Sequence, residues 1–320
     1  GGYIKSRKGI NLPDVVLNTS PLTPKDIDDL KFILTQEIDW IALSFVQKLS
    51  DVLEVKKYVG NKAGIIAKIE KPSALGELKE IIAACEGVMV ARGDLGVELP
   101  PESVPGIQKE IILACREQGK PVIVATQMLE SMIDSPSPTR AEASDVATAV
   151  FDGADAVMLS AETAVGQFPI ETVTIMNRII CSAEMHIKDH PHNAPQVLEN
   201  GNLIYHAVSR SAVKLAESVG ASAVVAFTAS GSTAYRMARE RPNLLLVVMT
   251  PELKVKRRLS LLWGAYSFVS KVQGYEAAIQ EAKDIIKNKS FAKTDDTIVV
   301  VAGMPFGISG STNSIRVVDI

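Results

Sequence analysis

The 320-residue sequence has few cysteines, few aromatic residues and no long hydrophobic run. Its three cysteines, Cys85, Cys115 and Cys181, lie far apart and form no CxxC pair. This spacing excludes a disulfide framework or a cysteine-rich zinc site and favours a reduced, cytoplasmic setting. The longest apolar runs, such as Leu244–Met249, have the length of a strand rather than the ~18 residues of a membrane span. No signal peptide is visible, and we expect no membrane partner.

The sequence also lacks an excess of positive charge and two common nucleotide-binding motifs. Its 34 Lys and Arg residues face 37 Asp and Glu residues, which gives a net charge of −3 and argues against a nucleic-acid partner. It contains neither a P-loop nor a GxGxxG fingerprint, so a bound nucleotide must be held in another way. The residues AVILMFWYC make up 47%, enough for sizeable cores, and the length allows about two domains.

The first half of the sequence repeats one unit: a short apolar run, a polar cluster and an amphipathic helix. Nearly continuous apolar runs are typical of parallel strands that are covered on both faces. Five strands are predicted, over Asp39–Phe45, Gly64–Glu70, Gly87–Arg92, Pro121–Thr126 and Ala154–Ser160. Thr23 and Pro24 predict a helix that starts before the first strand, with Thr23 as N-cap. The pattern predicts βα units and therefore an α/β fold.

A linker-like stretch over residues 189–201 separates this half from a second, smaller α/β domain. Three helices are predicted there, over Ile204–Val219, Ser232–Arg239 and Gln273–Asn288. Four strands are predicted, over Ala223–Phe227, Leu244–Met249, Tyr266–Ser270 and Thr297–Val301.

Polar side chains follow each strand of the first half, where a parallel α/β barrel carries its reactive groups. Lys68 and Glu70 are two residues apart on one strand and so point to the same face. Glu70 and Asp94, at the ends of neighbouring strands, can supply two oxygen ligands for Mg²⁺. Lys68 beside such a metal would be a cation directed at a phosphate or an enolate oxygen. The alternative is a structural salt bridge between Lys68 and Glu70.

Three further segments are candidates, each with a simpler structural alternative. The turn Arg92-Gly93-Asp94 offers backbone N–H groups to a carboxylate, or it is an ordinary turn. Thr126 ends the fourth strand, where its hydroxyl holds a water, relays a proton or only satisfies the backbone. In the second domain, the segment 228–233 between a strand and a helix is either a phosphate pocket or a plain N-cap turn.

Taken together, these motifs closely resemble the pyruvate kinase family over essentially the whole chain. The most specific stretch is Ala125–Ile133 with its continuation Pro138–Ala147, where the sequence reads ATQMLESMI and then PTRAEASDVA. The stretches Ser6–Pro13, Ile66–Glu70, Met89–Gly96 and Met158–Thr163 agree with it. The resemblance implies phosphoryl transfer from phosphoenolpyruvate to ADP, giving pyruvate and ATP.

The resemblance also implies roles for individual residues. Glu70 and Asp94 would hold Mg²⁺ or Mn²⁺, and Lys68 would stabilise charge on the phosphoryl group and the enolate. The backbone of Arg92, Gly93 and Asp94 would take the substrate carboxylate, and Thr126 would lie near the face where the enolate is protonated. Ser44, Phe45, Ser160 and Glu162 would line the site. The turn formed by Thr228, Ala229, Ser230, Gly231, Ser232 and Thr233 matches the family's effector-phosphate loop.

The fold implied by the resemblance is a partial (β/α)₈ TIM barrel plus a C-terminal three-layer α/β domain. Residues 1–13 would end the lid insertion, residues 14–190 would form the C-terminal part of the barrel, and residues 191–320 would form the effector-binding domain. The family's members are usually homotetramers that need Mg²⁺ and often K⁺. The effector would be fructose bisphosphate, a sugar monophosphate, AMP or none. Ser232 follows Gly231 where some relatives have a basic residue, which argues against a bisphosphate.

The sequence begins Gly1-Gly2 without a methionine and contains five of the eight expected βα units. We therefore interpret the chain as a fragment and expect it to be unstable or inactive alone. Two other functions stay open from the residues: another metal-dependent barrel enzyme of pyruvate or phosphoenolpyruvate, or a non-catalytic regulatory chain.

Overall fold

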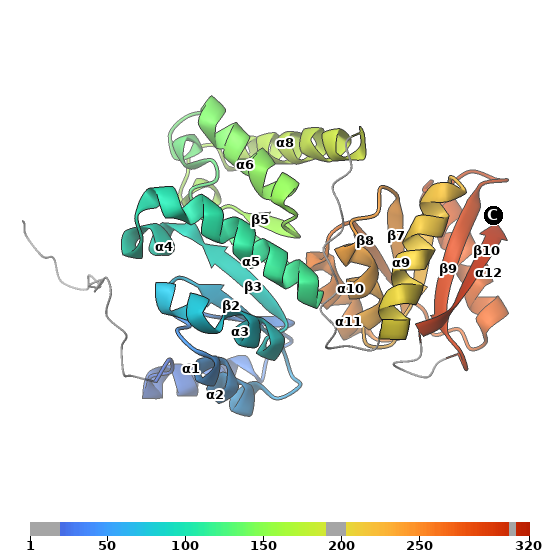
Figure 1. The fold of residues 1–320 in the computed structure, drawn as a ribbon, viewed down its shortest axis with the longest axis horizontal. Coiled ribbons are helices and arrows are strands. Elements are labelled where there is room, and N and C mark those ends of the chain that lie inside the picture. Colours follow the sequence, from blue (N-terminus) through green and yellow to red (C-terminus); the bar gives the residue numbers. More distant parts are fainter. Residues whose placement is uncertain (1–19, 190–202, 307–311) are drawn as a thin grey trace, which may run out of the picture. The chain divides into compact units, whose positions relative to one another are not determined.

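The computed structural model describes residues 20–189, 203–306 and 312–320, and the chain forms two compact units (Figure 1). The first unit takes in the described residues up to Ala114, together with Ile123–Asp145 and Val157–Ile175. The second takes in Cys115–Val122, Val146–Ala156 and the described residues from Met176 to Ile320. The predicted lid segment, residues 1–13, lies outside the described residues, and the predicted domain boundaries stay predictions.

The first half of the chain forms a five-stranded sheet in the order β1-β2-β3-β4-β5, here called sheet A. Its strands are β1 (Trp40–Leu43), β2 (Gly64–Ile69), β3 (Gly87–Ala91), β4 (Val122–Ala125) and β5 (Ala156–Met158). The β1–β2 and β2–β3 pairs are parallel. A sequential strand order with a helix after each strand is the winding of a (β/α) barrel, whereas a doubly wound sheet reverses direction at its centre. The predicted α/β fold is therefore confirmed.

Helices precede, separate and follow these strands. They are α1 (Pro24–Ile33), α2 (Leu49–Val59), α3 (Leu78–Ala84), α4 (Arg92–Glu98), α5 (Val104–Gln118), α6 (Arg140–Asp152), α7 (Ala161–Ala164) and α8 (Pro169–Asp189). Three short 3₁₀ turns lie at Pro72–Glu77, Pro101–Ser103 and Glu130–Ile133. As predicted, α1 begins after Thr23, whose side chain forms a reciprocal capping box with Asp26.

The second half of the chain forms another five-stranded sheet, in the order β10-β9-β6-β7-β8, here called sheet B. Its strands are β6 (Ala223–Phe227), β7 (Leu245–Thr250), β8 (Ala265–Val269), β9 (Thr297–Gly303) and β10 (Thr312–Asp319). Its helices are α9 (Leu203–Ser218), α10 (Ser232–Arg239), α11 (Leu253–Arg258) and α12 (Tyr275–Asn288), with a 3₁₀ turn at Leu259–Leu261. Among the described strands of sheet B, β10 alone pairs antiparallel, along β9. The sequence pattern did not predict β10.

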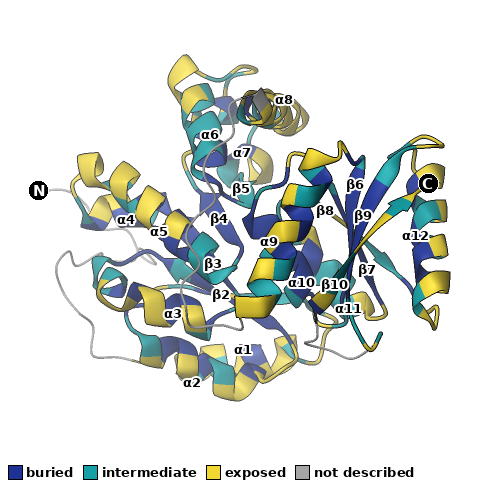
Figure 2. Ribbon diagram, turned by 45° about the vertical axis from the view of Figure 1, so that its right-hand side comes forward, coloured by how far each residue is buried: buried dark blue, intermediate teal, exposed yellow. Residues whose placement is uncertain are grey.

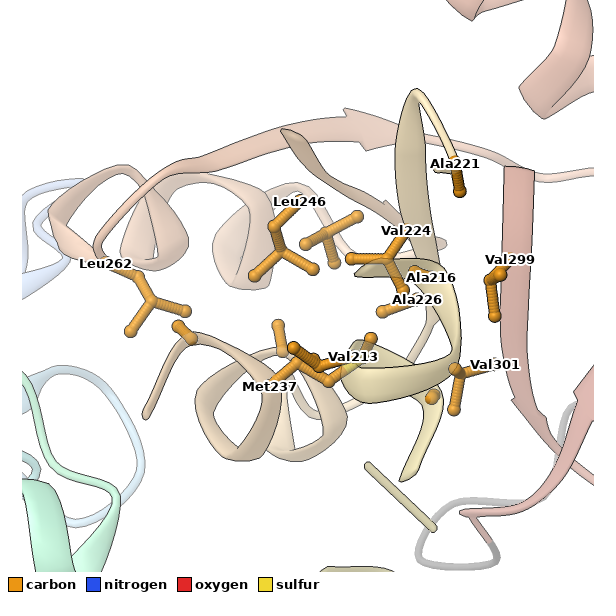
Figure 3. Packing of buried hydrophobic residues seen from close by; sticks show 14 of the residues in the cluster. Val213, Ala216, Ala221, Val224, Ala226, Met237, Leu246, Leu262, Val299 and Val301 are labelled. Atoms are coloured by element: carbon orange, nitrogen blue, oxygen red, sulfur yellow. The ribbon is translucent and has the colours of Figure 1, made fainter. Parts of the chain in front are cut away.

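The strands β6, β7 and β9 of sheet B are buried on both faces because alternate residues of each enter different cores. One core joins its strands to α9 and α10 and contains residues such as Val224, Leu246 and Met237 (Figure 3). The other core joins the intervening strand residues, such as Val225 and Val247, to α12. Figure 2 shows β6, β7 and β9 mostly buried and the outer faces of the helices exposed. The result is the predicted three-layer α/β arrangement.

The two tryptophans of the chain are divided between the units. Trp40 lies on β1 in the first unit, where a Cβ at Gly64 would meet its ring at 2.6 Å, so β2 needs glycine at that position. Trp263 lies in the second unit, with the guanidinium of Arg241 4.9 Å from its ring centroid. Among the described helices, none is both long and apolar enough to cross a membrane.

Candidate functional site

The predicted site residues lie at the carboxyl ends of the five strands of sheet A. Ser44 and Phe45 follow β1, Lys68 lies on β2 and Glu70 follows it, Arg92, Gly93 and Asp94 open α4 after β3, Thr126 follows β4, and Ser160 and Glu162 follow β5. Because parallel strands end at the same edge, these residues gather at one edge of the sheet. Their contacts divide them into three groups.

The first group surrounds the Glu70 carboxylate, which is only 1% exposed. Lys68 Nζ lies 2.5 Å from Glu70 Oε1 and donates a hydrogen bond to Ser44 Oγ at 2.9 Å. The backbone N–H of Phe45 donates to the other carboxylate oxygen at 2.7 Å. The salt bridge between Lys68 and Glu70, the structural alternative for these residues, is therefore present. This geometry also holds the ammonium group of Lys68, whose side chain is 23% exposed, beside a fixed carboxylate at the carboxyl edge of the sheet.

The second group joins the start of α4 to the end of β4. Thr126 Oγ1 accepts a hydrogen bond from Gly93 N at 2.7 Å and donates one to the Ala125 carbonyl at 2.6 Å. The buried Arg92 guanidinium donates to the Thr126 carbonyl at 2.7 Å and pairs with Asp145 Oδ1 at 2.7 Å. The Gly93 N–H, expected to meet a substrate carboxylate, is therefore used by Thr126 in this structure.

The third group lies after β5. Glu162 is 2% exposed and accepts hydrogen bonds from Ser160 N at 2.7 Å and from Leu129 N at 3.3 Å. It therefore ties this loop to the segment that follows β4. The Ser160 and Glu162 contacts support a role in shaping the edge, and a substrate contact for either residue stays a prediction.

Two of these strand ends carry left-handed backbone at residues that are not glycine. Phe45, which is 51% exposed, has φ 56°, and Thr126 and Gln127 have φ 69° and 55°. Such conformations cost roughly 1–3 kcal/mol each and persist where the surroundings over-determine them, often at functional sites. The hydrogen bonds of Glu70 to Phe45 and of Arg92 to Thr126 are the local contacts that hold these turns.

Glu70 and Asp94 are the predicted metal ligands. They follow neighbouring strands, and Asp94 has no hydrogen-bond or ion-pair partner among the described residues. No cluster of three or more His, Cys, Asp or Glu side chains suited to a metal occurs in the part of the chain that the structure describes. Mg²⁺ commonly takes one or two carboxylates and fills its other positions with water and substrate oxygens. One fixed and one uncommitted carboxylate at the same edge fit that requirement.

Two partners of this edge were missed by the sequence reasoning. Asp145 neutralises Arg92, and Glu98 pairs with Lys71 in a buried contact. Asp145 lies in the stretch that most specifically resembles the family, and this position could have indicated a role at the site. Nothing in the spacing of Lys71 and Glu98 indicated that they would meet.

In the second unit, the predicted effector turn Thr228–Thr233 borders a cavity of about 580 Å³. The Thr228 hydroxyl accepts a hydrogen bond from Gly231 N at 3.0 Å, and Gly231 has φ 87°. Thr233 shares a buried hydrogen bond of 2.7 Å with Thr312. The wall also contains Phe227, Ala229, Ser230, Ser232, Thr250, Ser270, Lys271 and Phe306. Hydroxyl groups, one lysine and aromatic edges thus surround a space large enough for a small ligand.

Comparison with known proteins identifies the family. The pyruvate kinase barrel domain matches residues 1–173, and the pyruvate kinase alpha/beta domain matches residues 206–318. The chain belongs to the pyruvate kinase family. A pyruvate kinase of Agrobacterium vitis is 53% identical over 324 residues, covering 100% of this chain and 67% of that protein. Pyruvate kinases of Methylorubrum extorquens and Mycobacterium tuberculosis are 48% and 45% identical over 99% of this chain and 66% and 67% of their own lengths.

This membership confirms the predicted family, the fold class and the reaction, phosphoryl transfer from phosphoenolpyruvate to ADP. The chain spans about two thirds of the length of these relatives. Phosphoenolpyruvate and ADP as substrates and pyruvate as product follow from the same membership.

Proposed function

We propose that Lys68, Glu70 and Asp94 perform the phosphoryl transfer at the carboxyl edge of sheet A. The observation that carries this proposal is the contact of Lys68 with the buried Glu70 carboxylate. Phosphoryl transfer depends on positioning and on neutralising charge rather than on covalent chemistry by the protein. The Lys68 ammonium group, fixed by a carboxylate and a hydroxyl, supplies both together with the Asp94 carboxylate in the helix that follows the next strand.

Glu70 and Asp94 would hold the divalent cation, Mg²⁺ or Mn²⁺. When bound, such a cation neutralises charge on the phosphoryl oxygens and on the enolate that remains. K⁺ as a second cation is proposed from the resemblance to the family alone.

Lys68 and Thr126 would act on the substrate itself. The Lys68 ammonium keeps a free N–H after donating to Ser44 and pairing with Glu70, so it can donate to a phosphoryl or enolate oxygen. The Thr126 hydroxyl already accepts from Gly93 and donates to Ala125, which leaves one lone pair for a water on the face where the enolate is protonated. Thr126 would therefore orient the proton donor.

The substrate carboxylate would bind at the backbone of residues 92–94, as expected from the sequence. Because Thr126 occupies the Gly93 N–H, a carboxylate must replace that hydrogen bond or use the neighbouring N–H groups. Ser44, Phe45, Ser160 and Glu162 would shape the rest of the pocket.

For the second unit we propose that the cavity beside Thr228–Thr233 binds a phosphorylated sugar or AMP as an effector. Its hydroxyl groups and Lys271 suit a phosphate group. We also propose that the enzyme forms ATP as a homotetramer in the cytoplasm. The tetramer and the ATP product are proposed from the family resemblance, and the cytoplasmic location from the cysteine pattern.

The proposal is tested by coupled turnover of phosphoenolpyruvate and ADP with Mg²⁺, on the 320-residue chain and on Lys68→Met. Lys57→Met, on the exposed side of α2, is the matched control. We expect Lys68→Met to lose turnover and Lys57→Met to keep it. Loss of phosphoenolpyruvate without ADP would favour a lyase, and sugar-phosphate binding without turnover would favour a regulatory chain. Measurable turnover that is equal in Lys68→Met and in the unmodified chain would refute the role of Lys68. No turnover in either protein would agree with the expectation that the chain is inactive alone.

A further inference from the structure

A buried ion pair joins Lys71 and Glu98, which are close in sequence to the proposed metal ligands Glu70 and Asp94. Lys71 Nζ and Glu98 Oε1 are 2.5 Å apart, and their side chains are only 8% and 4% exposed. Removing both charges from water is costly, and a well-packed apolar pair of similar volume would hold the two elements at least as firmly. Packing alone therefore does not explain why charged residues stand here.

The pair connects the two elements that carry the proposed metal ligands. Lys71 is the residue after Glu70 at the end of β2, and Glu98 is the last residue of α4. Asp94 and Glu98 are four residues apart on α4, so they lie on the same face of that helix, about 6 Å apart along its axis. The Lys71–Glu98 contact thus fastens the helix face that bears Asp94 to the backbone that bears Glu70.

Helix α4 depends on contacts with other elements to hold its position. It has seven residues, two of them glycines, and its N-cap residue makes no side-chain cap. A helix this short and glycine-rich is marginal by itself, so external contacts set its position. At its first turn, Arg92 pairs with Asp145 and bonds the Thr126 carbonyl, and at its last residue Glu98 pairs with Lys71.

We propose that Lys71 and Glu98 are positioning residues that set the separation of the Glu70 and Asp94 carboxylates and so the affinity for the divalent cation. This inference rests on the proposed function, in which those two carboxylates hold the metal. In this arrangement, neither Lys71 nor Glu98 contacts the substrate or the metal.

The test measures Mn²⁺ binding to the full 320-residue chain by electron paramagnetic resonance of free Mn²⁺, without substrates. The central variant is the double change Lys71→Met with Glu98→Met, which removes both charges and leaves no unpaired buried ion. Glu98→Asp keeps both charges and shortens the link by one carbon. The control is Lys56→Met, at an ion pair with Glu86 that is 42% and 36% exposed in the same unit.

We expect the double variant to keep its thermal midpoint and to bind Mn²⁺ roughly 10–100-fold more weakly, the usual effect of removing a residue that orients a metal ligand. Glu98→Asp should weaken binding less, and Lys56→Met should not change it. Should the double variant unfold, Glu98→Asp decides: weaker Mn²⁺ binding in a folded protein supports the inference, and unchanged binding overturns it. Unchanged Mn²⁺ affinity in a folded double variant also overturns it.

Glu70→Gln and Asp94→Asn separate this failure from a failure of the proposed function. If these two variants lose Mn²⁺ binding while the double variant does not, the metal assignment stands and the positioning role is wrong. If they bind Mn²⁺ normally, the metal assignment itself is wrong, and the positioning inference falls with it.

Discussion

Thr126→Val removes the hydroxyl that joins the end of β4 to the start of α4, and it changes little else. Valine has the same branched shape as threonine, so the cost of the left-handed backbone at φ 69° is the same before and after. The variant loses two hydrogen bonds, from Gly93 N at 2.7 Å and to the Ala125 carbonyl at 2.6 Å. At about 1 kcal/mol each, we expect the free energy of unfolding to fall by about 2 kcal/mol.

The assay combines urea unfolding, followed by circular dichroism, with hydrogen exchange at the Gly93 amide. A loss of about 2 kcal/mol corresponds to a thermal midpoint lowered by roughly 4–8 °C for a unit of this size. The Gly93 amide should exchange faster in Thr126→Val and at its original rate in Thr126→Ser, which keeps the hydroxyl. A stability unchanged within about 0.5 kcal/mol, with unchanged exchange at Gly93, would refute the reasoning.

Three other predictions concern pH and backbone conformation. Partial burial alone would raise the pKa of Glu142, but hydrogen bonds from Ser131 and Thr139 hold it below its ordinary value, so this contribution to stability is lost as pH falls through the lowered pKa. Glu142→Gln should therefore flatten acid unfolding curves below about pH 4.5. Burial and two neighbouring arginines lower the pKa of His206 to about 4, so the free energy of unfolding should decline as pH falls from about 6.5 to 4. The decline should be smaller than the full pKa shift implies because His206 is partly exposed. His206→Gln should remove this decline, as measured by urea unfolding at a series of pH values. Gly231→Ala, at φ 87°, should lower the stability of the second unit by about 1 kcal/mol in thermal unfolding and weaken binding of a phosphorylated effector.

Much of the fold could be predicted because parallel strands have a simple signature. The predicted runs Gly64–Glu70 and Gly87–Arg92 contain β2 and β3 and overrun them by one residue each. The strands of sheet B inside its two cores were found for the same reason. Strand β10 was missed because it lies at an edge, where its side chains are only partly buried and no apolar run develops.

The candidate site was predictable at the level of strand ends but not at the level of pairings. Lys68 and Glu70 share a face by strand alternation, and the structure brings them into contact. The contacts of Arg92 with Asp145 and of Lys71 with Glu98 span 53 and 27 residues of chain. Such distances in sequence depend on where the helices pack against the sheet, which no local periodicity specifies. The hydrogen bond from Gly93 N to Thr126 Oγ1 also joins residues far apart in sequence, and so it could not be predicted either.

The division of the two tryptophans between the units gives the molecule a built-in optical probe. Trp40 lies against Gly64 on sheet A, whereas Trp263 lies under the guanidinium of Arg241 in the second unit. The tryptophan emission of a chain with Trp263→Phe would come from the first unit alone, and that of a chain with Trp40→Phe from the second unit alone. Fluorescence of the two single-tryptophan chains would therefore show whether the units melt together or one at a time.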